Sequence, residues 1–205
     1  MRKLVVTTFA TLDGVMQAPG GPDEDRDGGF EHGGWSVGYW DEMMGSVAEE
    51  IHLAAGAVLF GRRTYETLAG YWPHVGDDQP LAAKLNSVPK HVASTSRPNL
   101  EWSNSMLLEG EIPEAVMGLK AGDGDPVLVI GSSALLQTLI RHDLVDTFTV
   151  WTFPVVVGEG KRLFGSGAIP AGLRLADTRT STTGVTIATY ERDGEIKGGT
   201  FGLDD

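Results

Sequence analysis

The chain has 205 residues, a length that suits one domain with a sizeable core, and 41% of them are apolar, as in ordinary globular proteins. The formal net charge of −12 argues against binding to nucleic acid or to an anionic membrane surface, although local arginines can still attract an anionic ligand. The absence of cysteine excludes disulfides, cysteine-ligated zinc and thiol catalysis.

The chain begins with a β-rich run at residues 3–12, which we predict to be the first strand. Basic residues followed by apolar ones give this start a faint likeness to a secretory signal, but Thr7, Thr8 and Thr11 dilute the apolar region and Asp13 ends it. No apolar stretch approaches the roughly 20 residues of a membrane span. We therefore expect a cytoplasmic protein that acts on a small molecule and binds neither nucleic acid nor a membrane.

A loop rich in Gly, Pro, Asp and Glu follows at residues 17–38, and its length favours a functional loop or lid. Apolar spacing then predicts helices at residues 41–55, 64–69, 77–88, 113–120 and 133–141. Strand patterns fall at residues 57–60, 90–95, 100–108, 127–130, 146–157, 173–180 and 185–192. This order predicts one α/β domain over residues 1–205, a three-layer α/β/α sandwich whose mostly parallel central sheet ends in an antiparallel C-terminal hairpin.

Two of the short apolar runs end in glycine and pass directly into a helical pattern. One continues as Gly61-Arg62-Arg63-Thr64 and the other as Gly131-Ser132-Ser133. A helix that starts after glycine offers free backbone N–H groups to an anion, and the two arginines could pair with a 2′-phosphate. Together the turns predict a binding site for a phosphorylated cofactor, and the arginines favour NADPH over NADH. A GxGxxG fingerprint is absent, and plain helix caps with solvated arginines are the alternative for each turn.

A third polar strand end follows the pattern at residues 90–95. Ser94, Thr95 and Ser96 stand there, with Arg97 next in the chain. Ligands of open α/β sheets bind at the carboxyl ends of strands, so these hydroxyls would suit the adenosine phosphate of the cofactor. Capping of the loop by the same hydroxyls is the alternative.

No pattern in the chain predicts a metal site. Asp23, Asp25 and Asp27 match the opening of a calcium loop, but Gly34 stands where the required Glu should be, so we interpret the segment as a solvated acidic loop. The five histidines also lack metal-ligand spacing.

Aromatic side chains gather near the long loop. Trp35, Tyr39, Trp40 and Trp72 could stack on a planar ligand ring, or they could pin the loop to the core. The segment Gly158-Glu159-Gly160-Lys161-Arg162 reads as a tight turn, with a phosphate loop as the alternative.

In this order and spacing, the motifs resemble the dihydrofolate reductase-like superfamily, specifically the branch with the reductase (RibD C-terminal) domain of bacterial riboflavin biosynthesis. The likeness covers nearly the whole length. The segments that carry it are Thr11-Leu12-Asp13-Gly14, Leu59 to Glu66, Lys90 to Thr95, Gly131-Ser132-Ser133, Leu144-Val145-Asp146 and Phe153 to Gly160.

The resemblance implies NADPH as hydride donor to a small heterocyclic substrate, pyrimidine-like as in 5-amino-6-(5-phosphoribosylamino)uracil reductases or pterin-like as in dihydrofolate reductases. It implies that Asp13 and Gly14 lie beside the nicotinamide and the substrate, and it makes a homodimer plausible through a sheet edge or the C-terminal hairpin. The cofactor contacts that it implies by position are Gly61, Arg62, Thr64, Ser94, Thr95, Gly131, Ser132 and Ser133.

The sequence departs from classical dihydrofolate reductases at the position expected for the proton donor. Classical dihydrofolate reductases carry a carboxylate on the helix before the first Gly-Arg turn, and the matching position lies near Gly45, about one turn after Asp41. Asp13 and Asp41 are our catalytic candidates, with pKa values that burial would have to raise, and Trp40 is the candidate substrate contact. The alternative functions are a non-catalytic sensor or partner module that holds NADPH or a related nucleotide, and a plain structural domain.

Overall fold

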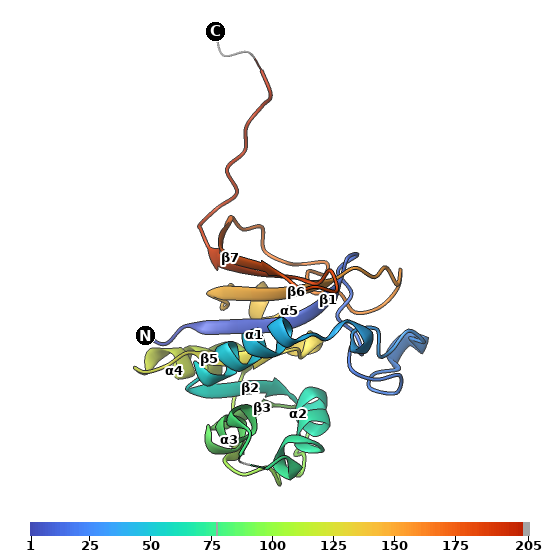
Figure 1. Cartoon of the computed structure of the whole chain (residues 1–205). Helices are drawn as coiled ribbons and strands as arrows, with labels where there is room; N and C mark the ends of the chain where they lie inside the picture. The colour runs from blue at the N-terminus through green and yellow to red at the C-terminus, as the bar shows by residue number, and fades with distance from the viewer. Residues whose placement is uncertain (77, 203–205) are drawn as a thin grey trace.

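The computed structural model describes residues 1–76 and 78–202, which fold around an eight-stranded sheet (Figure 1). The sheet order is β4-β3-β2-β5-β1-β6-β8-β7. The strands are β1 (Leu4–Thr11), β2 (Ala57–Gly61), β3 (Lys90–Ala93), β4 (Ser105–Leu107), β5 (Val127–Ile130), β6 (Thr147–Phe153), β7 (Leu173–Thr180) and β8 (Thr186–Arg192). The six strands from β4 to β6 are parallel and the last two form an antiparallel hairpin, which confirms the predicted fold class.

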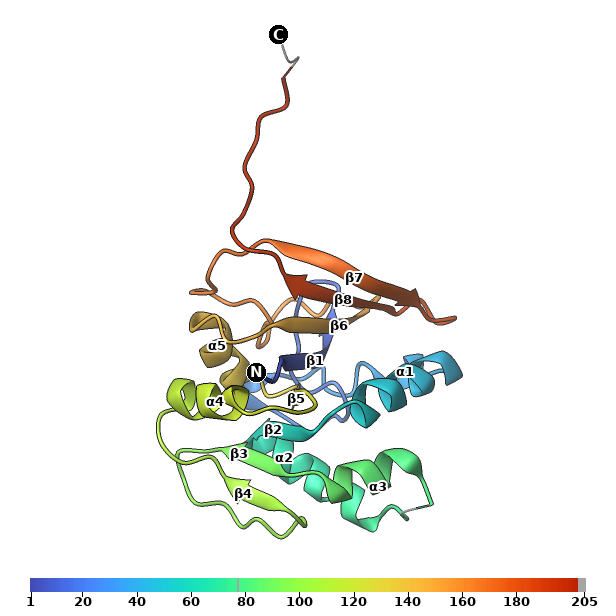
Figure 2. The same ribbon diagram turned by 90° about the vertical axis from the view of Figure 1, so that its left-hand side faces the viewer.

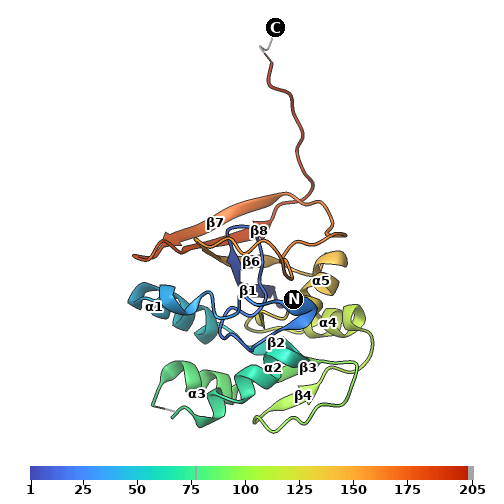
Figure 3. The ribbon, with the colours of Figure 1, turned by 90° about the vertical axis from the view of Figure 1, so that its right-hand side faces the viewer.

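Helices cover both faces of this sheet and make three layers (Figures 2 and 3). One face carries α4 and α5, and the other carries α1, α2 and α3. The helices are α1 (Glu42–Leu53), α2 (Arg62–Ala69), α3 (Pro80–Ser87), α4 (Ile112–Ala121) and α5 (Ser133–Arg141), with 3-10 turns at Asp27–Gly29, Val37–Tyr39 and Trp72–His74. Within residues 1–76 and 78–202, no helix has both the length and the apolar character needed to cross a bilayer.

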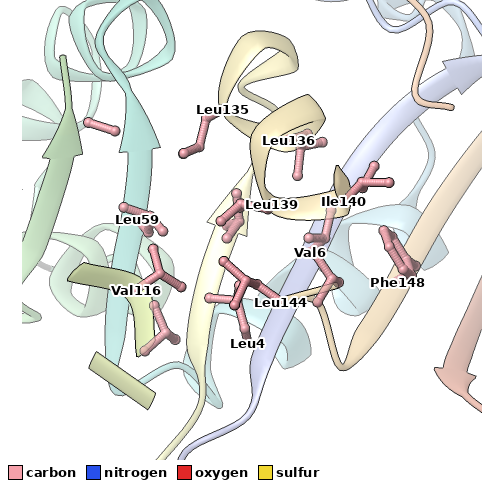
Figure 4. Close-up of a cluster of buried hydrophobic side chains, with 14 of the residues drawn as sticks. Leu4, Val6, Leu59, Val116, Leu135, Leu136, Leu139, Ile140, Leu144 and Phe148 are labelled. Atoms are coloured by element: carbon pink, nitrogen blue, oxygen red, sulfur yellow. The ribbon is translucent and has the colours of Figure 1, made fainter. Parts of the chain in front are cut away.

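The largest core lies between the sheet and the α4–α5 layer (Figure 4). Alternate side chains of a strand point to opposite faces, so Leu4 and Val6 of β1 and Leu59 of β2 all reach this layer. They pack there with Val116 of α4 and Leu136 of α5, and all five side chains are fully buried. This packing fixes α5 against the centre of the sheet.

A second core lies on the opposite face, beneath α1. Trp151 and Phe153 of β6 pack there with Phe9 of β1, and Met44 and Val47 close the cluster from the helix. The ring centroid of Phe9 lies 5.4 Å from that of Trp151 and 5.1 Å from that of Phe153. The start of α1 is thereby held close to the ends of β1 and β6.

The ends of most predicted elements differ by one or two residues from those in the structure, and the strand predicted at residues 146–157 ends four residues earlier, at Phe153. Two further elements are clearly shorter than predicted. The strand predicted at residues 100–108 is only β4, because residue Trp102 just before it turns inward, where its backbone N–H donates to the Tyr65 hydroxyl. The helix predicted at residues 77–88 is α3, which begins with proline in its first turn; residue 77 lies outside the described residues.

Lys90 of β3 places an ammonium group inside the protein. The side chain is fully buried, and its Nζ donates to the carbonyls of Val88 and Ser103 at 2.8 Å and of Asn86 at 3.3 Å. The same atom lies 4.8 Å from the ring centroid of Trp102. Burial lowers the pKa of Lys90 to about 8. The ammonium therefore ties the end of α3 to the segment that leads into β4.

The lowered pKa of Lys90 predicts an alkaline rise in stability. Between about pH 8 and the ordinary lysine pKa of 10.5, the unfolded chain binds more protons than the native one, so the free energy of unfolding increases with pH. The Lys90→Met variant is expected to lack this rise and to be destabilised by about 2 kcal/mol at pH 7, because three buried carbonyls lose their donor.

Urea unfolding from pH 7 to 10.5 measures both effects, and Lys197→Met in the exposed C-terminal segment is the control. Parallel pH profiles for the wild type and Lys90→Met would refute the account of Lys90.

Candidate cofactor and active site

The two glycine turns predicted from the sequence lie side by side at one edge of the sheet. Their strands, β2 and β5, are adjacent and parallel, so both carboxyl ends reach the same edge. The Gly61 N–H donates to Ser132 Oγ at 2.9 Å, and that hydroxyl donates to the Ile130 carbonyl at 2.9 Å. A Cβ on Gly61 would lie 3.4 Å from the Ser132 Cβ, so glycine permits this close approach.

The third predicted strand end joins the same cluster. Arg62 Nη1 donates to Ser96 Oγ at 3.0 Å, and its Nε donates to Glu66 Oε1 at 2.7 Å within α2. The Ser96 N–H in turn donates to Ser94 Oγ at 3.1 Å. The structure thus brings a guanidinium, several hydroxyls and the starts of α2 and α5 to one edge. Such a set of donors fits the phosphates of a dinucleotide.

The remaining predicted cofactor residues have different surroundings. Thr64 lies against the second turn, since a Cβ on Gly131 would be 3.9 Å from its Oγ1. Ser133 is the first residue of α5, and Thr95 lies exposed between the two serines at the end of β3.

Arg63 turns away from its neighbour Arg62 toward the long loop. Its Nη1 lies 2.6 Å from Asp25 Oδ1 and 2.7 Å from Asp27 Oδ2. Lys161 Nζ contacts the same two carboxylates, at 2.5 Å from Asp25 and 2.8 Å from Asp27. Hydrogen bonds first from Arg63 and then from Lys161 hold the pKa of Asp27 far below its usual range. The prediction of a solvated acidic loop is wrong for Asp25, whose ion-paired side chain is 10% exposed, whereas Asp27 is ion-paired and still 55% exposed.

Metal binding finds no support in the part of the chain that the structure describes, where no cluster of three or more His, Asp or Glu side chains is arranged to hold an ion. Asp23, the first residue of the calcium-like pattern, pairs with Arg26 at 2.5 Å instead of joining Asp25 and Asp27.

Asp13 holds the end of β1 to the segment after β6. Its carboxylate accepts hydrogen bonds from Thr11 Oγ1 at 2.6 Å, from the Gly158 N–H at 2.9 Å and from the Val157 N–H at 3.3 Å. The bond from Thr11 is the main reason that the pKa of Asp13 lies below its usual value. Gly14 follows with a φ of +83°, a left-handed conformation that favours glycine. Near neutral pH Asp13 is therefore an ionised acceptor in a turn.

Asp41 caps the start of α1. One carboxylate oxygen accepts from the Met44 N–H at 2.9 Å, and the other accepts from the backbone N–H and the hydroxyl of Thr182 at 2.8 and 2.7 Å. The bond from Met44 contributes most to lowering the pKa of Asp41. The contacts give Asp13 and Asp41 structural roles, and proton supply by either stays a prediction that these pKa directions do not favour.

Trp40 is a half-exposed aromatic residue beside the start of α1. Its ring is parallel to that of Trp151, with 6.1 Å between centroids and 6° between planes, and half of the side chain is exposed. Trp35 and Tyr39 instead pack edge-on against Phe153, so these two pin the loop to the core. Of the aromatic residues near the loop, Trp40 has the geometry to stack on a planar ring.

Sequence reasoning did not identify Lys161 as an ion-pair partner of the loop. The segment 158–162 carries a weak signal, two glycines followed by two basic residues, which predicts a tight turn without indicating what its cations contact. Thr182, at the tip of the C-terminal hairpin, was missed for a related reason, because threonine in a hairpin turn carries no sign of a distant partner.

The sequence matches a known family along most of its length. The family model described as the RibD C-terminal domain matches residues 2–188. The uncharacterized protein YyaP of Bacillus subtilis is 26% identical over 196 residues, which cover 94% of this chain and 96% of YyaP.

Crystal structures that share the fold include the following three. A candidate riboflavin biosynthesis protein of Shewanella sp. PV-4 is 20% identical with a TM-score of 0.64, over 93% of this chain and 99% of that one. A pyrimidine reductase-like protein of Corynebacterium diphtheriae is 11% identical with a TM-score of 0.62, and the match covers 95% of this chain and 93% of that one. The diaminohydroxyphosphoribosylaminopyrimidine deaminase/5-amino-6-(5-phosphoribosylamino)uracil reductase of Thermotoga maritima is 15% identical with a TM-score of 0.60, and the match covers 94% of this chain but 57% of that longer protein.

The contacts of Asp41 predict a structural phenotype for Asp41→Ala. Loss of the helix cap and of both bonds from Thr182 is expected to lower the midpoint of urea unfolding at pH 7. Because the native pKa is lowered, Asp41 contributes stability above its unfolded pKa of about 4 and loses it as pH falls through the native value. The difference between variant and wild type should shrink below pH 4. Glu42→Ala, which alters the adjacent exposed carboxylate, is the control, and equal midpoints for the wild type and Asp41→Ala would contradict the assignment.

Proposed function

The chain belongs to the RibD C-terminal domain family, and we propose that it is an NADPH-dependent reductase that transfers hydride to a small heterocyclic substrate. The observation that carries this proposal is the meeting of three strand ends at one edge, with Arg62 and Ser96 beside the starts of α2 and α5. Bound NADPH supplies the hydride, while the protein supplies binding, orientation and electrostatics.

The donor set fits a phosphorylated dinucleotide. Arg62 and the hydroxyls at the end of β3 suit the 2′-phosphate, because a guanidinium forms paired, charge-assisted bonds with phosphate oxygens. The start of α5 after Gly131 suits the pyrophosphate, because its backbone N–H groups and dipole favour an anion. NADH lacks the 2′-phosphate, so the proposal includes discrimination between the two cofactors.

The proposed substrate class is pyrimidine- or pterin-like. The names of the Thermotoga and Corynebacterium proteins refer to pyrimidine reduction, and this chain shares their fold. A planar ring of this kind could stack on the half-exposed side chain of Trp40 beside the start of α1. Asp13 and Asp41, as ionised acceptors, would fix the turns that border the substrate. The cytoplasm is the proposed compartment.

A second candidate function is a non-catalytic protein that holds NADPH or a related nucleotide as a sensor or partner module. The observation that favours it is the lowered pKa of both Asp13 and Asp41, since neither carboxylate is a proton donor near neutral pH. Both functions need the phosphate-binding edge, and turnover with a pyrimidine or pterin substrate separates them.

Calorimetric titration with NADPH and NADH tests the cofactor proposal. The wild type is expected to bind NADPH at least tenfold more tightly than NADH. Arg62→Gln should weaken NADPH binding by about tenfold, the cost of one charge-assisted contact, and change NADH binding by less than about twofold. Arg141→Gln, at the far end of α5, is the matched control. Absence of heat and of a thermal shift with either cofactor would overturn the proposal.

We also propose a homodimer formed through one face of the C-terminal hairpin. The charged side chains of β7 lie on the α1 side of the sheet, where Arg179 pairs with Glu50 and Arg174 pairs with Glu191. On the opposite side, Leu173 and Leu175 of β7 are exposed, together with Phe164 and Ile169 of the segment before it, around the ion pair between Arg192 and Asp143. β7 thus carries its charged side chains on one side and its exposed leucines on the other, as expected where a second copy covers the leucine side.

Light scattering on a gel-filtration column tests the homodimer. The wild type is expected to elute with twice the mass of one chain, and Leu175→Glu should shift it to the monomer by placing a charge in the apolar contact. Met117→Glu, an equally exposed apolar position on α4, is the control. A monomeric wild type at micromolar concentrations would contradict the proposal.

A further inference from the structure

Four charged side chains form a cluster that we term the loop clasp: Asp25, Asp27, Arg63 and Lys161. It joins three segments that are far apart in the sequence, namely the loop at 17–38, the first turn of α2 and the segment at 158–162. Each carboxylate contacts both cations, and the side chain of Asp25 is only 10% exposed. Isolated surface ion pairs contribute little to stability, but a network with a nearly buried member holds its partners more firmly.

Hydrogen bonds between the Gln17 side chain and the backbone reinforce the loop clasp. Gln17 Nε2 donates to the carbonyls of Asp25 and Asp27 at 3.1 and 3.0 Å, while its Oε1 accepts from the Lys161 N–H at 3.0 Å. The Gln17 side chain is almost completely buried. The loop carboxylates are therefore presented to Arg63 on a fixed backbone. Asp27 and Lys161 also line a groove of about 550 Å³ between the loop and the segment at 157–161.

Arg63 is the member that connects the loop clasp to the phosphate-binding edge. It follows Arg62 in the first turn of α2, one residue from the guanidinium that contacts Ser96. A phosphate and a pair of carboxylates are alternative counter-ions for a guanidinium, since both accept its N–H groups in paired bonds. The loop carboxylates thus occupy donors that a ligand phosphate at the start of α2 would also attract.

We infer that Asp25 and Asp27 compete with a ligand phosphate for Arg63, so that phosphate binding at the start of α2 releases the loop from the loop clasp. The inference rests on the proposed function, because that function provides the phosphate. The coupling is reciprocal: a loop held by the loop clasp weakens phosphate binding by the same factor by which phosphate weakens the loop clasp.

The experiment compares the wild type with Asp25→Asn/Asp27→Asn, which keeps the side-chain shape and removes both counter-ions. Titration with NADPH measures affinity, and hydrogen exchange of the amides at residues 18–34 measures loop protection. The double variant is expected to bind NADPH about tenfold more tightly, and NADPH should reduce loop protection in the wild type. The matched control, Asp23→Asn/Glu31→Gln, removes two charges from the same loop outside the loop clasp and should leave the affinity within about twofold.

The outcomes separate this inference from the proposed function. Equal NADPH affinity in the wild type and the double variant, or a loop that gains protection when NADPH binds, overturns the competition while leaving the reductase proposal intact. Failure of every variant to bind NADPH overturns both. Asp27→Asn alone provides a second route should the double variant not fold: it removes the more exposed of the two carboxylates that contact Arg63 and is expected to raise affinity in the same direction by a smaller factor.

Discussion

The hydrogen bond between the Gly61 amide and the Ser132 hydroxyl joins the two turns on which the candidate site is built. It forms because β2 and β5 are adjacent and parallel, and because Gly61 carries no side chain to separate them. With this spacing fixed, α2 and α5 begin at the same edge, and Arg62 reaches the end of β3. The phosphate-binding edge is thus a consequence of sheet order combined with one close backbone approach.

Much of this arrangement follows from local sequence signals. A short apolar run, a glycine and a helical pattern identify a strand-to-helix turn, and parallel strands bring such turns to one edge. Gly61 and Gly131 are therefore adjacent in the structure as the sequence leads one to expect. The order of the strands in the sheet is harder to predict from the sequence. β5 lies between β1 and β2 because of contacts among many buried side chains, and no local pattern specifies those contacts.

The partners of the charged side chains could not be predicted from local sequence patterns. Arg63 and Arg62 are identical neighbours in the sequence, yet one faces the loop and the other faces β3. Asp13 and Asp41 were sensible acids by position, and the donors that lower their pKa values most, Thr11 and Met44, are near in the sequence. Each carboxylate is also tied to a residue more than a hundred positions away, Gly158 for Asp13 and Thr182 for Asp41. The path of a loop decides such pairings, and residue type alone does not reveal that path.

The strongly negative surface has a consequence for how an anionic ligand arrives. With a formal charge of −12, the molecule repels a phosphorylated dinucleotide at long range, while the guanidinium of Arg62 attracts it only at short range. Dissolved salt screens interactions beyond roughly 8 Å at physiological ionic strength, so it removes the distant repulsion before it weakens the close contact. Added salt therefore weakens the long-range repulsion between the protein and the anionic ligand, and the association rate should rise with ionic strength. In a basic nucleotide-binding protein, salt weakens an attraction and the association rate falls.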